Sequence, residues 1–515
     1  MDRMIPNFRI LLLAVLYLFS NVGGINGQNN AVKVAPVFQS NMVLQLDMPI
    51  HIWGTAVPGE KVEVSFDGTT KNVNADKKGD WSVTFPKRKA SFQPVDLKVG
   101  NLHFTNILVG ELWFCSGQSN MAFPLKKSDF TNWKEKSQNE NIRLLRMGNI
   151  RAVAKDGYTN EELARCNVND FFKGTWEESD SVVAANFSAV GWITGNNLYK
   201  KLNVPVGIIQ VAVGGSAINN WLPPHFMKNH PLTENLYKTD WIKNEEVIFP
   251  HRRRVKEAFQ NILKEGEPYI PGEMPYRWMC EPGFLYEAGI QPLKGLNIKG
   301  VLWYQGEAET LSETAVNNYV TLFDALVSSW RTNFQNSELP FISVQLPGFN
   351  RETWPGFREV QRKASDNIGN VYMVTTIDLG DEKNIHPTDK TAVGNRLADS
   401  ALKNVYGKTG IADFPLLKTA EVKNDTVELK FDNCYLGWQK VEGNVPGFEL
   451  AGIDNKFYPV RAVVKGKNKI VIQLENKNSL NLRYGWAPFP KPALKLFNSE
   501  GLPLGPFNAK IKEQN

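Results

Sequence analysis

Four residues whose types suit acyl transfer stand at the ends of apolar stretches in this 515-residue chain. They are Ser119 in "SGQSNM", Gly215 in "GGSAINNW", Gln305 in "WYQGEAE" and His386 in "NIHPTDK". A serine hydroxyl becomes a nucleophile when a neighbouring base, most often histidine, accepts its proton. Backbone N–H groups and a side-chain amide can stabilise the oxyanion that the attack creates. The sequence therefore predicts Ser119 as nucleophile, His386 as base, and an oxyanion hole formed by the N–H groups of Ser119 and Gly215 and the amide of Gln305.

The apolar stretches before these residues have the character of buried strands. They are residues 107–115, 204–213, 298–305, 340–346 and 370–379, and they alternate with residues 189–202 and 315–330, whose apolar side chains recur every three or four positions. Apolar strands that alternate with amphipathic helices are typical of a parallel sheet covered on both faces. Ligands bind beyond the carboxyl ends of such strands, so we expect the four residues to meet at one edge of the sheet.

Each of these residues also has a structural interpretation. Ser119 could be an ordinary turn serine, and the pair that ends in Gly215 could form a tight turn. Ser216 is expected to cap a helix rather than to act as a second nucleophile. Glu307 and Glu309 could be a glycosidase carboxylate pair, but two close glutamates in one loop are more typical of surface charge. The combination of residues carries the prediction, because no single residue does.

Shorter alternating segments flank the central region. Residues 31–105 and 411–515 contain runs of β-branched and aromatic residues bounded by turns, which predicts a β-sandwich-like domain on each side. The catalytic domain is expected at residues 106–410. Within it, residues 222–285 show no clear period and are interpreted as an insertion that could wall a pocket.

The N-terminus has the layout of a cleavable signal peptide. Residues 1–27 combine two arginines with a short apolar core, which is too short for a stable membrane span. The protein is therefore predicted to be secreted or periplasmic.

Composition and charge exclude several classes of protein. The hydrophobic fraction of 42% is that of an ordinary globular protein, and the net charge of +6 is mild. The basic run "HRRRVK" at residues 251–256 is interpreted as a solvated helix face, because a nucleic-acid site needs a larger basic surface. The four cysteines lack metal-ligand spacing and no His-Glu-x-x-His motif occurs. We expect no nucleic-acid partner, no metal and no cofactor.

Four segments in this order resemble the sialate O-acetylesterase family of SGNH-type hydrolases. They are "GQSNM", "VPVGIIQVAVGGSAINNW", "GVLWYQGEAET" and "NIHPTDKTAVGNRLA", with agreement also in "PVFQSNMVLQ" near the start and "LNLRYGW" near the end. The resemblance implies a flavodoxin-like three-layer α/β/α domain with accessory β-domains, and hydrolysis of acetyl esters on sugars. It also implies that Ser119 is the nucleophile, His386 the base, and Gly215 and Gln305 members of the oxyanion hole.

The acid that would orient His386 departs from the pattern of many such hydrolases, which place an aspartate three residues before the histidine. Lys383 occupies that position here, and a charged lysine cannot accept the imidazole N–H. Asp378 and Asp381 lie farther back in the same loop. A Ser–His dyad, with His386 oriented by a backbone carbonyl or another acceptor, is favoured over a triad with either aspartate.

The predicted function is hydrolysis of acetyl esters on an O-acetylated sugar or glycan, by an acyl-enzyme on Ser119. Glu307 is expected to support its loop through hydrogen bonds. Three alternatives remain at this point: an acetylxylan or other polysaccharide deacetylase of the same fold, a glycosidase that uses Glu307, and a noncatalytic glycan-binding protein.

Overall fold

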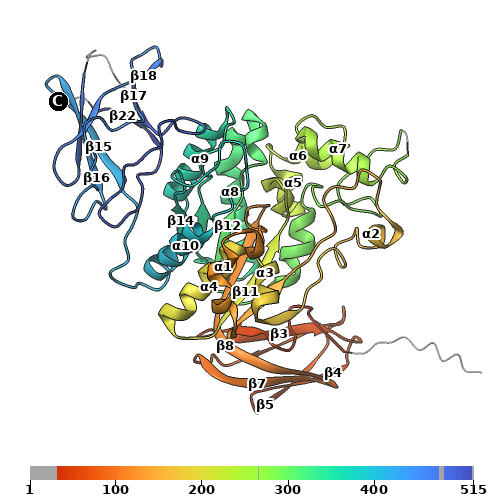
Figure 1. Cartoon of the computed structure of the whole chain (residues 1–515). Coiled ribbons are helices and arrows are strands. Elements are labelled where there is room, and N and C mark those ends of the chain that lie inside the picture. Colours follow the sequence, from red (N-terminus) through yellow and green to blue (C-terminus); the bar gives the residue numbers. More distant parts are fainter. Residues whose placement is uncertain (1–31, 265, 475–480, 513–515) are drawn as a thin grey trace, which may run out of the picture.

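The computed structural model describes residues 32–264, 266–474 and 481–512 and is a mixed α/β structure with several sheets (Figure 1). The predicted signal peptide at residues 1–27 lies outside the described residues. Among the residues that are described, no helix has the length and apolar character needed to cross a bilayer.

The central strands form a largely parallel sheet with the order β10-β9-β11-β8-β12-β13-β14. Their bounds are β8 Leu102–Gly117, β9 Asn139–Arg146, β10 Trp176–Ser179, β11 Val206–Ala212, β12 Gly300–Tyr304, β13 Phe341–Val344 and β14 Val371–Val374. The five predicted strands are β8, β11, β12, β13 and β14, and neighbours among them pair in parallel. Every residue of β11 and β12 is buried, as expected for strands covered on both faces. β9 and β10, which the apolar pattern does not predict, extend the sheet beyond β11.

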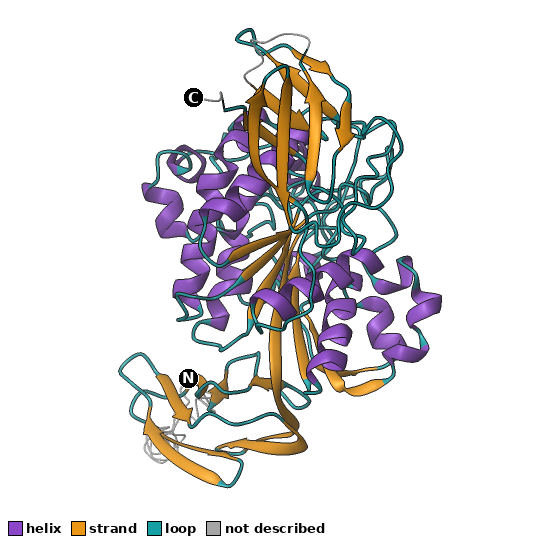
Figure 2. Cartoon of the chain, turned by 90° about the vertical axis from the view of Figure 1, so that its left-hand side faces the viewer, coloured by secondary structure: helices purple, strands orange, loops and turns teal. Residues whose placement is uncertain are grey.

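The two predicted helices of the central region correspond to α4 (Ala189–Leu202) and α8 (Glu313–Asn333). Each begins at a serine whose side chain accepts a hydrogen bond from a first-turn N–H, Ser188 from Gly191 and Ser312 from Ala315. The other helices are α1 (Phe130–Trp133), α2 (Asn160–Ala164), α3 (Ser181–Asn186), α5 (Pro224–Asn229), α6 (Glu234–Lys238), α7 (Phe249–Ala258), α9 (Trp354–Asn367) and α10 (Thr391–Asn404). α4 packs against α10 and α8 against α9, and Figure 2 shows helices on both sides of the central strands.

β8 joins the N-terminal strands to the central sheet. Its first half pairs antiparallel with β7, and its second half pairs in parallel with β11 and β12. The N-terminal strands are β1 (Lys33–Val34), β2 (Val43–Gln45), β3 (Ile50–Thr55), β4 (Lys61–Phe66), β5 (Thr69–Asn74), β6 (Asp80–Phe85) and β7 (Ser91–Val99). Alternate residues of β4 and β6 are buried, as in strands with one face toward a core. One apolar core includes both these strands and the central sheet, and the boundary predicted between residues 105 and 106 falls inside β8.

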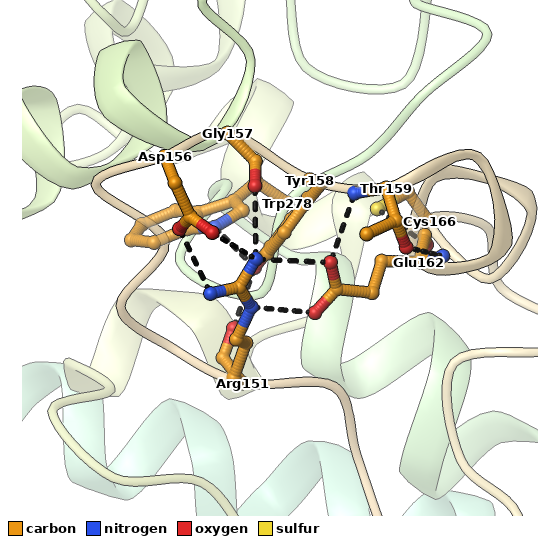
Figure 3. A network of polar contacts seen from close by, with 8 residues as sticks. All are labelled: Arg151, Asp156, Gly157, Tyr158, Thr159, Glu162, Cys166 and Trp278. Carbon is orange, nitrogen blue, oxygen red and sulfur yellow. Dashed lines mark hydrogen bonds and ion pairs between the residues drawn. The ribbon is translucent and has the colours of Figure 1, made fainter.

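The insertion at residues 222–285 contains the short helices α5, α6 and α7 and long irregular segments. A chain of hydrogen bonds anchors it to the loop before α2 (Figure 3). Trp278 Nε1 donates to the Tyr158 hydroxyl at 3.1 Å, and that hydroxyl donates to the carbonyl oxygen of Arg151 at 2.7 Å. The Arg151 guanidinium pairs with Glu162 at 2.6 Å. These side-chain contacts thus hold the irregular part of residues 222–285 against the loop before α2.

The C-terminal strands form two four-stranded antiparallel sheets, with orders β15-β16-β20-β19 and β18-β17-β21-β22. Their bounds are β15 Leu416–Lys423, β16 Thr426–Asp432, β17 Phe448–Ala451, β18 Phe457–Pro459, β19 Ala462–Val464, β20 Lys469–Gln473, β21 Asn481–Tyr484 and β22 Phe507–Lys510. These strands enclose an apolar core of their own, separate from the core of the central sheet. In Figure 1 they lie at the opposite end of the molecule from the N-terminal strands.

Candidate active site

Ser119 and His386, which are 267 positions apart in the sequence, lie within hydrogen-bonding distance. The Ser119 Oγ is 2.8 Å from the Nε2 of His386. Ser119 follows the carboxyl end of β8, and His386 lies in the loop between β14 and α10. The chain turns at Gly117, whose φ of +132° favours glycine and where a Cβ would lie 2.1 Å from the carbonyl oxygen of Tyr304. The end of β8 therefore presents Ser119 to the loop that carries His386.

The glycine loop after β11 lies against Ser119. A Cβ on Gly214 would lie 3.6 Å from the Cβ of Ser119. The backbone N–H groups of Ser119 and Gly215 donate to no acceptor in the part of the chain that the structure describes. The Gly215 carbonyl oxygen accepts a hydrogen bond from His251 Nε2 at 2.6 Å, which fixes the orientation of this peptide. Two free N–H donors beside a nucleophile are the components that an oxyanion hole requires.

Gln305 lies beneath this site rather than at its surface. It is fully buried, and its amide nitrogen donates to the carbonyl oxygen of Ser216 at 3.2 Å, to Gln118 Oε1 at 3.3 Å and to the carboxylate of Glu309. Glu309 also accepts a hydrogen bond from the N–H of Ile218 at 2.6 Å. The amide of Gln305 therefore connects the loop after β12 to the loop after β11.

The two candidate orienting aspartates have other partners. Asp378 binds Arg396 through both carboxylate oxygens, at 2.8 and 2.6 Å. Asp381 is exposed and accepts the backbone N–H groups of Lys383 at 2.8 Å and its neighbour Asn384 at 2.9 Å, and these bonds lower the pKa of its carboxyl. Across the described residues, the imidazole of His386 has one hydrogen-bond partner, Ser119.

Glu307 and Glu309 are buried, with exposed fractions of 3% and 2%, so the interpretation of this pair as surface charge is wrong. Glu307 Oε1 accepts a hydrogen bond from Asn120 Nδ2 at 2.5 Å, and the same nitrogen donates to the carbonyl oxygen of Ile385 at 3.0 Å. Lys390 Nζ donates to Asn120 Oδ1 at 2.7 Å. Burial raises the pKa of Glu307 to about 7 and lowers the pKa of Lys390 to about 8. Spacing in the sequence gives no sign of this network, because its members come from three loops.

The basic run at residues 251–256 is not simply a solvated helix face. It lies in α7, where His251 and Val255 are buried. Of the three arginines between them, Arg253 is exposed and the other two are half-buried. Burial lowers the pKa of His251 to about 4, so its imidazole is neutral and its Nε2–H can donate to Gly215. His251 also lines a cavity of about 300 Å³ between the insertion and the loops after β11 and β12. Residues of the 222–285 segment thus line a cavity, although the sequence gives no signal for His251.

Arg254, one turn farther along α7, lies over the glycine loop. Its Nη1 is 3.0 Å from the position that a Cβ on Gly215 would occupy, where φ is +80°. Its Nε is buried, and within the described residues its guanidinium has no hydrogen bond or ion pair. A half-buried guanidinium without a carboxylate partner is a ready site for an anionic group.

Comparisons with known proteins agree with the sequence motifs. Residues 270–403 match the family model described as carbohydrate esterase, sialic acid-specific acetylesterase. The sialate O-acetylesterase of Mus musculus is 26% identical and the alignment covers 99% of each chain, and that of Homo sapiens is 25% identical over 94% of this chain and 93% of its own. A solved carbohydrate acetylesterase from Xanthomonas citri is 27% identical with a TM-score of 0.74, covering 93% of this chain and 99% of that one. Residues 270–403 thus match a sialic acid-specific acetylesterase model, and the chain resembles the sialate O-acetylesterases over nearly its whole length, in agreement with the resemblance that the motifs carry.

Proposed function

We propose that this chain is a carbohydrate O-acetylesterase that hydrolyses acetyl esters on sugars through an acyl-enzyme on Ser119. The observation that carries the proposal is the 2.8 Å contact between Ser119 Oγ and His386 Nε2 at the carboxyl ends of β8 and its neighbours. The five predicted strands lie in the order second, first, third, fourth, fifth, which is the flavodoxin-like order. Ser119 stands where that order reverses, at the place where such sheets bind ligands. We extend the proposal to an SGNH-type three-layer domain, accessory β-domains and export through residues 1–27.

The reaction would proceed in two halves. Ser119 Oγ attacks the acetyl carbonyl carbon while His386 Nε2 accepts the hydroxyl proton. The N–H groups of Ser119 and Gly215 stabilise the oxyanion, the bond to the sugar oxygen breaks, and His386 returns the proton to that oxygen. A water molecule then loses a proton to His386 and attacks the acetyl-serine, which releases acetate and restores Ser119.

His386 must be neutral to accept a proton. Burial and the positive charges of Lys390 and Lys127 lower the pKa of its imidazole. The base form therefore persists below pH 6.5, the ordinary pKa of histidine, and we expect activity to fall only at more acidic pH.

Arg254 favours an acidic sugar over a neutral one as the substrate. Its guanidinium, which has no hydrogen bond or ion pair among the described residues, lies beside Gly215, and the neighbouring Gly214 lies against Ser119. A carboxylate on the sugar, as sialic acid carries, would give this group the charge-assisted partner it lacks. A xylan backbone offers no such anion, so this contact favours sialate esters over the acetylxylan alternative.

The experiment compares acetate release from 9-O-acetylated sialic acid and from acetylated xylan. We expect Arg254→Gln to lower kcat/KM for the sialate ester by roughly 10–100-fold relative to that for xylan, the value of one hydrogen bond between charged groups. The matched control is Arg253→Gln, because Arg253 is exposed on the same helix and pairs with Glu257. An equal fall in kcat/KM on both substrates would contradict the assignment of Arg254. If the wild type releases acetate from neither substrate, the proposed function is wrong.

A glycosidase that uses Glu307 is disfavoured by its surroundings. A retaining glycosidase needs two carboxyl groups about 5–5.5 Å apart across an open cleft. Glu307 is buried and one of its oxygens is held by Asn120. Acetate release with glycosidic bonds intact separates the esterase both from this alternative and from a noncatalytic glycan-binding protein.

A further inference from the structure

Lys390 and Asn120 form a buried connection between the two loops that carry Ser119 and His386. Asn120 follows Ser119 directly, and Lys390 follows His386 by four positions at the start of α10. The Asn120 side chain receives a hydrogen bond from Lys390 Nζ at 2.7 Å and donates to the carbonyl oxygen of Ile385 at 3.0 Å. Both loops therefore meet at a single amide.

We propose that Lys390 is a positioning residue for ester hydrolysis: its ammonium holds Asn120, and with it the Ser119 turn, against the His386 loop, and its positive charge opposes protonation of His386. This inference rests on the proposed function of Ser119 and His386. It assigns a role to a buried cation that no step of the reaction uses directly.

The cost of burying a lysine supports a specific role for it. Lys390 has an exposed fraction of 1%, and an ammonium taken out of water loses its hydration. Asn120 Oδ1 is its hydrogen-bond acceptor, and its Nζ also lies 4.9 Å from the ring centre of Phe123 and 5.7 Å from that of Tyr304. Rings attract a cation but do not fix its direction as an amide oxygen does. The Lys390–Asn120 bond is therefore the directional contact of this charge.

The charges around the two groups determine the sign of the electrostatic effect. Lys390 and Lys127 both disfavour protonation of His386. Glu307 and Asp389 favour the charged form of Lys390, whereas burial opposes it. The pKa of Lys390 is about 8, so the ammonium is largely charged over the range in which His386 titrates. Removal of this charge should make His386 easier to protonate.

The test uses Lys390→Met, which keeps most of the side-chain volume and removes the charge. We expect kcat on an aryl acetate to fall at least tenfold, and the acidic limb of the kcat/KM profile to move to higher pH by roughly 0.5–1.5 pH units. Lys390→Arg should lose rate without moving that limb, because it keeps the charge but not the shape. Lys383→Met is the matched control, since Lys383 is an exposed lysine of the same loop, and it should change neither quantity.

A second measurement does not depend on esterase activity. The chain has six histidines, and an imidazole NMR titration, with His386 identified by its loss in His386→Asn, gives its midpoint directly. We expect the midpoint of His386 to rise in Lys390→Met. An unchanged midpoint or acidic limb would overturn the proposal, even if the rate fell. If Lys390→Met fails to fold, Asn120→Ala takes its place: it keeps the charge and breaks the connection, so it should lower kcat without raising the midpoint, and an unchanged kcat would overturn the proposal.

Discussion

At the scale of single residues, the environment of His386 favours a dyad over a triad. Its loop contains Asp378 and Asp381, and both have other partners. Asp378 binds Arg396, and Asp381 accepts hydrogen bonds from backbone N–H groups. A triad aspartate holds the imidazole in its working tautomer, and its loss costs about 10⁴ in kcat. Neither aspartate is placed to do so.

We therefore expect Asp378→Asn and Asp381→Asn, made singly, each to lower kcat by less than about 10²-fold, well short of the loss of a triad member. His386→Ala should remove nearly all activity. Steady-state kinetics on an aryl acetate measure this, with circular dichroism to verify folding, since Asp378→Asn also weakens the Arg396 pair. An asparagine variant that is folded but as inactive as His386→Ala would make that aspartate the third member.

His251 gives the protein a pH-dependent stability of predictable sign. Its pKa is lowered from 6.5 to about 4 in the folded state, so between these values the unfolded chain binds more protons and stability falls as pH falls. Between pH 7.5 and pH 5 the loss from this group is ~2 kcal/mol. His251→Gln keeps an N–H donor for Gly215 but does not titrate.

As pH falls from 7.5 to 5, the free energy of unfolding of the wild type should therefore decrease by that amount relative to that of His251→Gln. Urea denaturation of both proteins measures this difference. The comparison removes the opposite contributions of Glu307 and Glu309, whose raised pKa values both proteins share. His225→Gln is the control, because His225 is exposed. A constant difference between wild type and His251→Gln would show that His251 is not held neutral.

At the scale of elements, the loops after β8, β11 and β12 act as one unit. The amide of Gln305 donates to the Ser216 carbonyl oxygen, to Gln118 and to Glu309, so all three loops meet at it. This arrangement favours a role for Gln305 in holding the loops over a role as an oxyanion donor.

Gln305→Ala separates the two roles. Loss of an oxyanion donor alone lowers kcat by roughly 10²–10³ without loss of stability. We expect the fall in kcat to be accompanied by a clear fall in Tm, because Ser216 and Glu309 lose a buried partner. Gln291→Ala, at an exposed position, should change neither. A large loss of kcat with an unchanged Tm would restore Gln305 to the oxyanion hole.

Sequence patterns predicted the strands and helices that are strongly apolar or periodic, and they missed those that are not. β11, β12 and the second half of β8 are almost entirely apolar, and α4 and α8 have helical spacing. β9 begins with Asn-Glu-Asn, and its buried residues are limited to Ile142–Leu145, so its apolar pattern is weak. Ser119 and His386 could be placed from the strand ends, because parallel strands bring their carboxyl ends together.

The residues that sequence reasoning missed are those whose environment comes from tertiary contacts. The burial of Glu307, the lowered pKa of His251 and the lack of a partner for the Arg254 guanidinium among the described residues depend on loops that meet only in the folded chain. Their residue types are equally common on surfaces. No spacing rule distinguishes a buried residue of this kind from one on the surface, because its partners lie far apart in the sequence.

At the scale of the whole molecule, several polar and apolar contacts join the central region to the C-terminal strands. Arg358 of α9 is fully buried and donates to the carbonyl oxygens of Gly485, at 3.3 Å, and Ala487. These carbonyls follow β21, so one side chain connects the central region to the C-terminal sheets. Burial lowers the pKa of this guanidinium to about 9.

Arg358→Ala should therefore loosen the C-terminal sheets while the core of the central sheet is retained. It leaves the carbonyl oxygens of Gly485, which is buried, and of Ala487 without this donor, at a cost of about 1–3 kcal/mol for the buried group, and creates a cavity. The substitution should increase the rate of amide hydrogen exchange more in β17 and β21 than in β11 and β12. Lys363→Ala, at an exposed position of the same helix, is the control, and uniform acceleration throughout the chain would contradict this view.

Covalent labelling tests most directly whether Ser119 is the nucleophile. Ser216, the other serine near the glycine loop, is buried and its hydroxyl is bound to the Val213 carbonyl oxygen and to Trp221 Nε1, at 2.9 and 3.0 Å. A fluorophosphonate reacts with an activated serine hydroxyl, and peptide mapping by mass spectrometry locates the adduct. We predict one adduct on Ser119 that is lost in His386→Ala and retained in Ser216→Ala. An adduct on Ser216, or full turnover by a folded Ser119→Ala protein, would show that Ser119 is not the nucleophile.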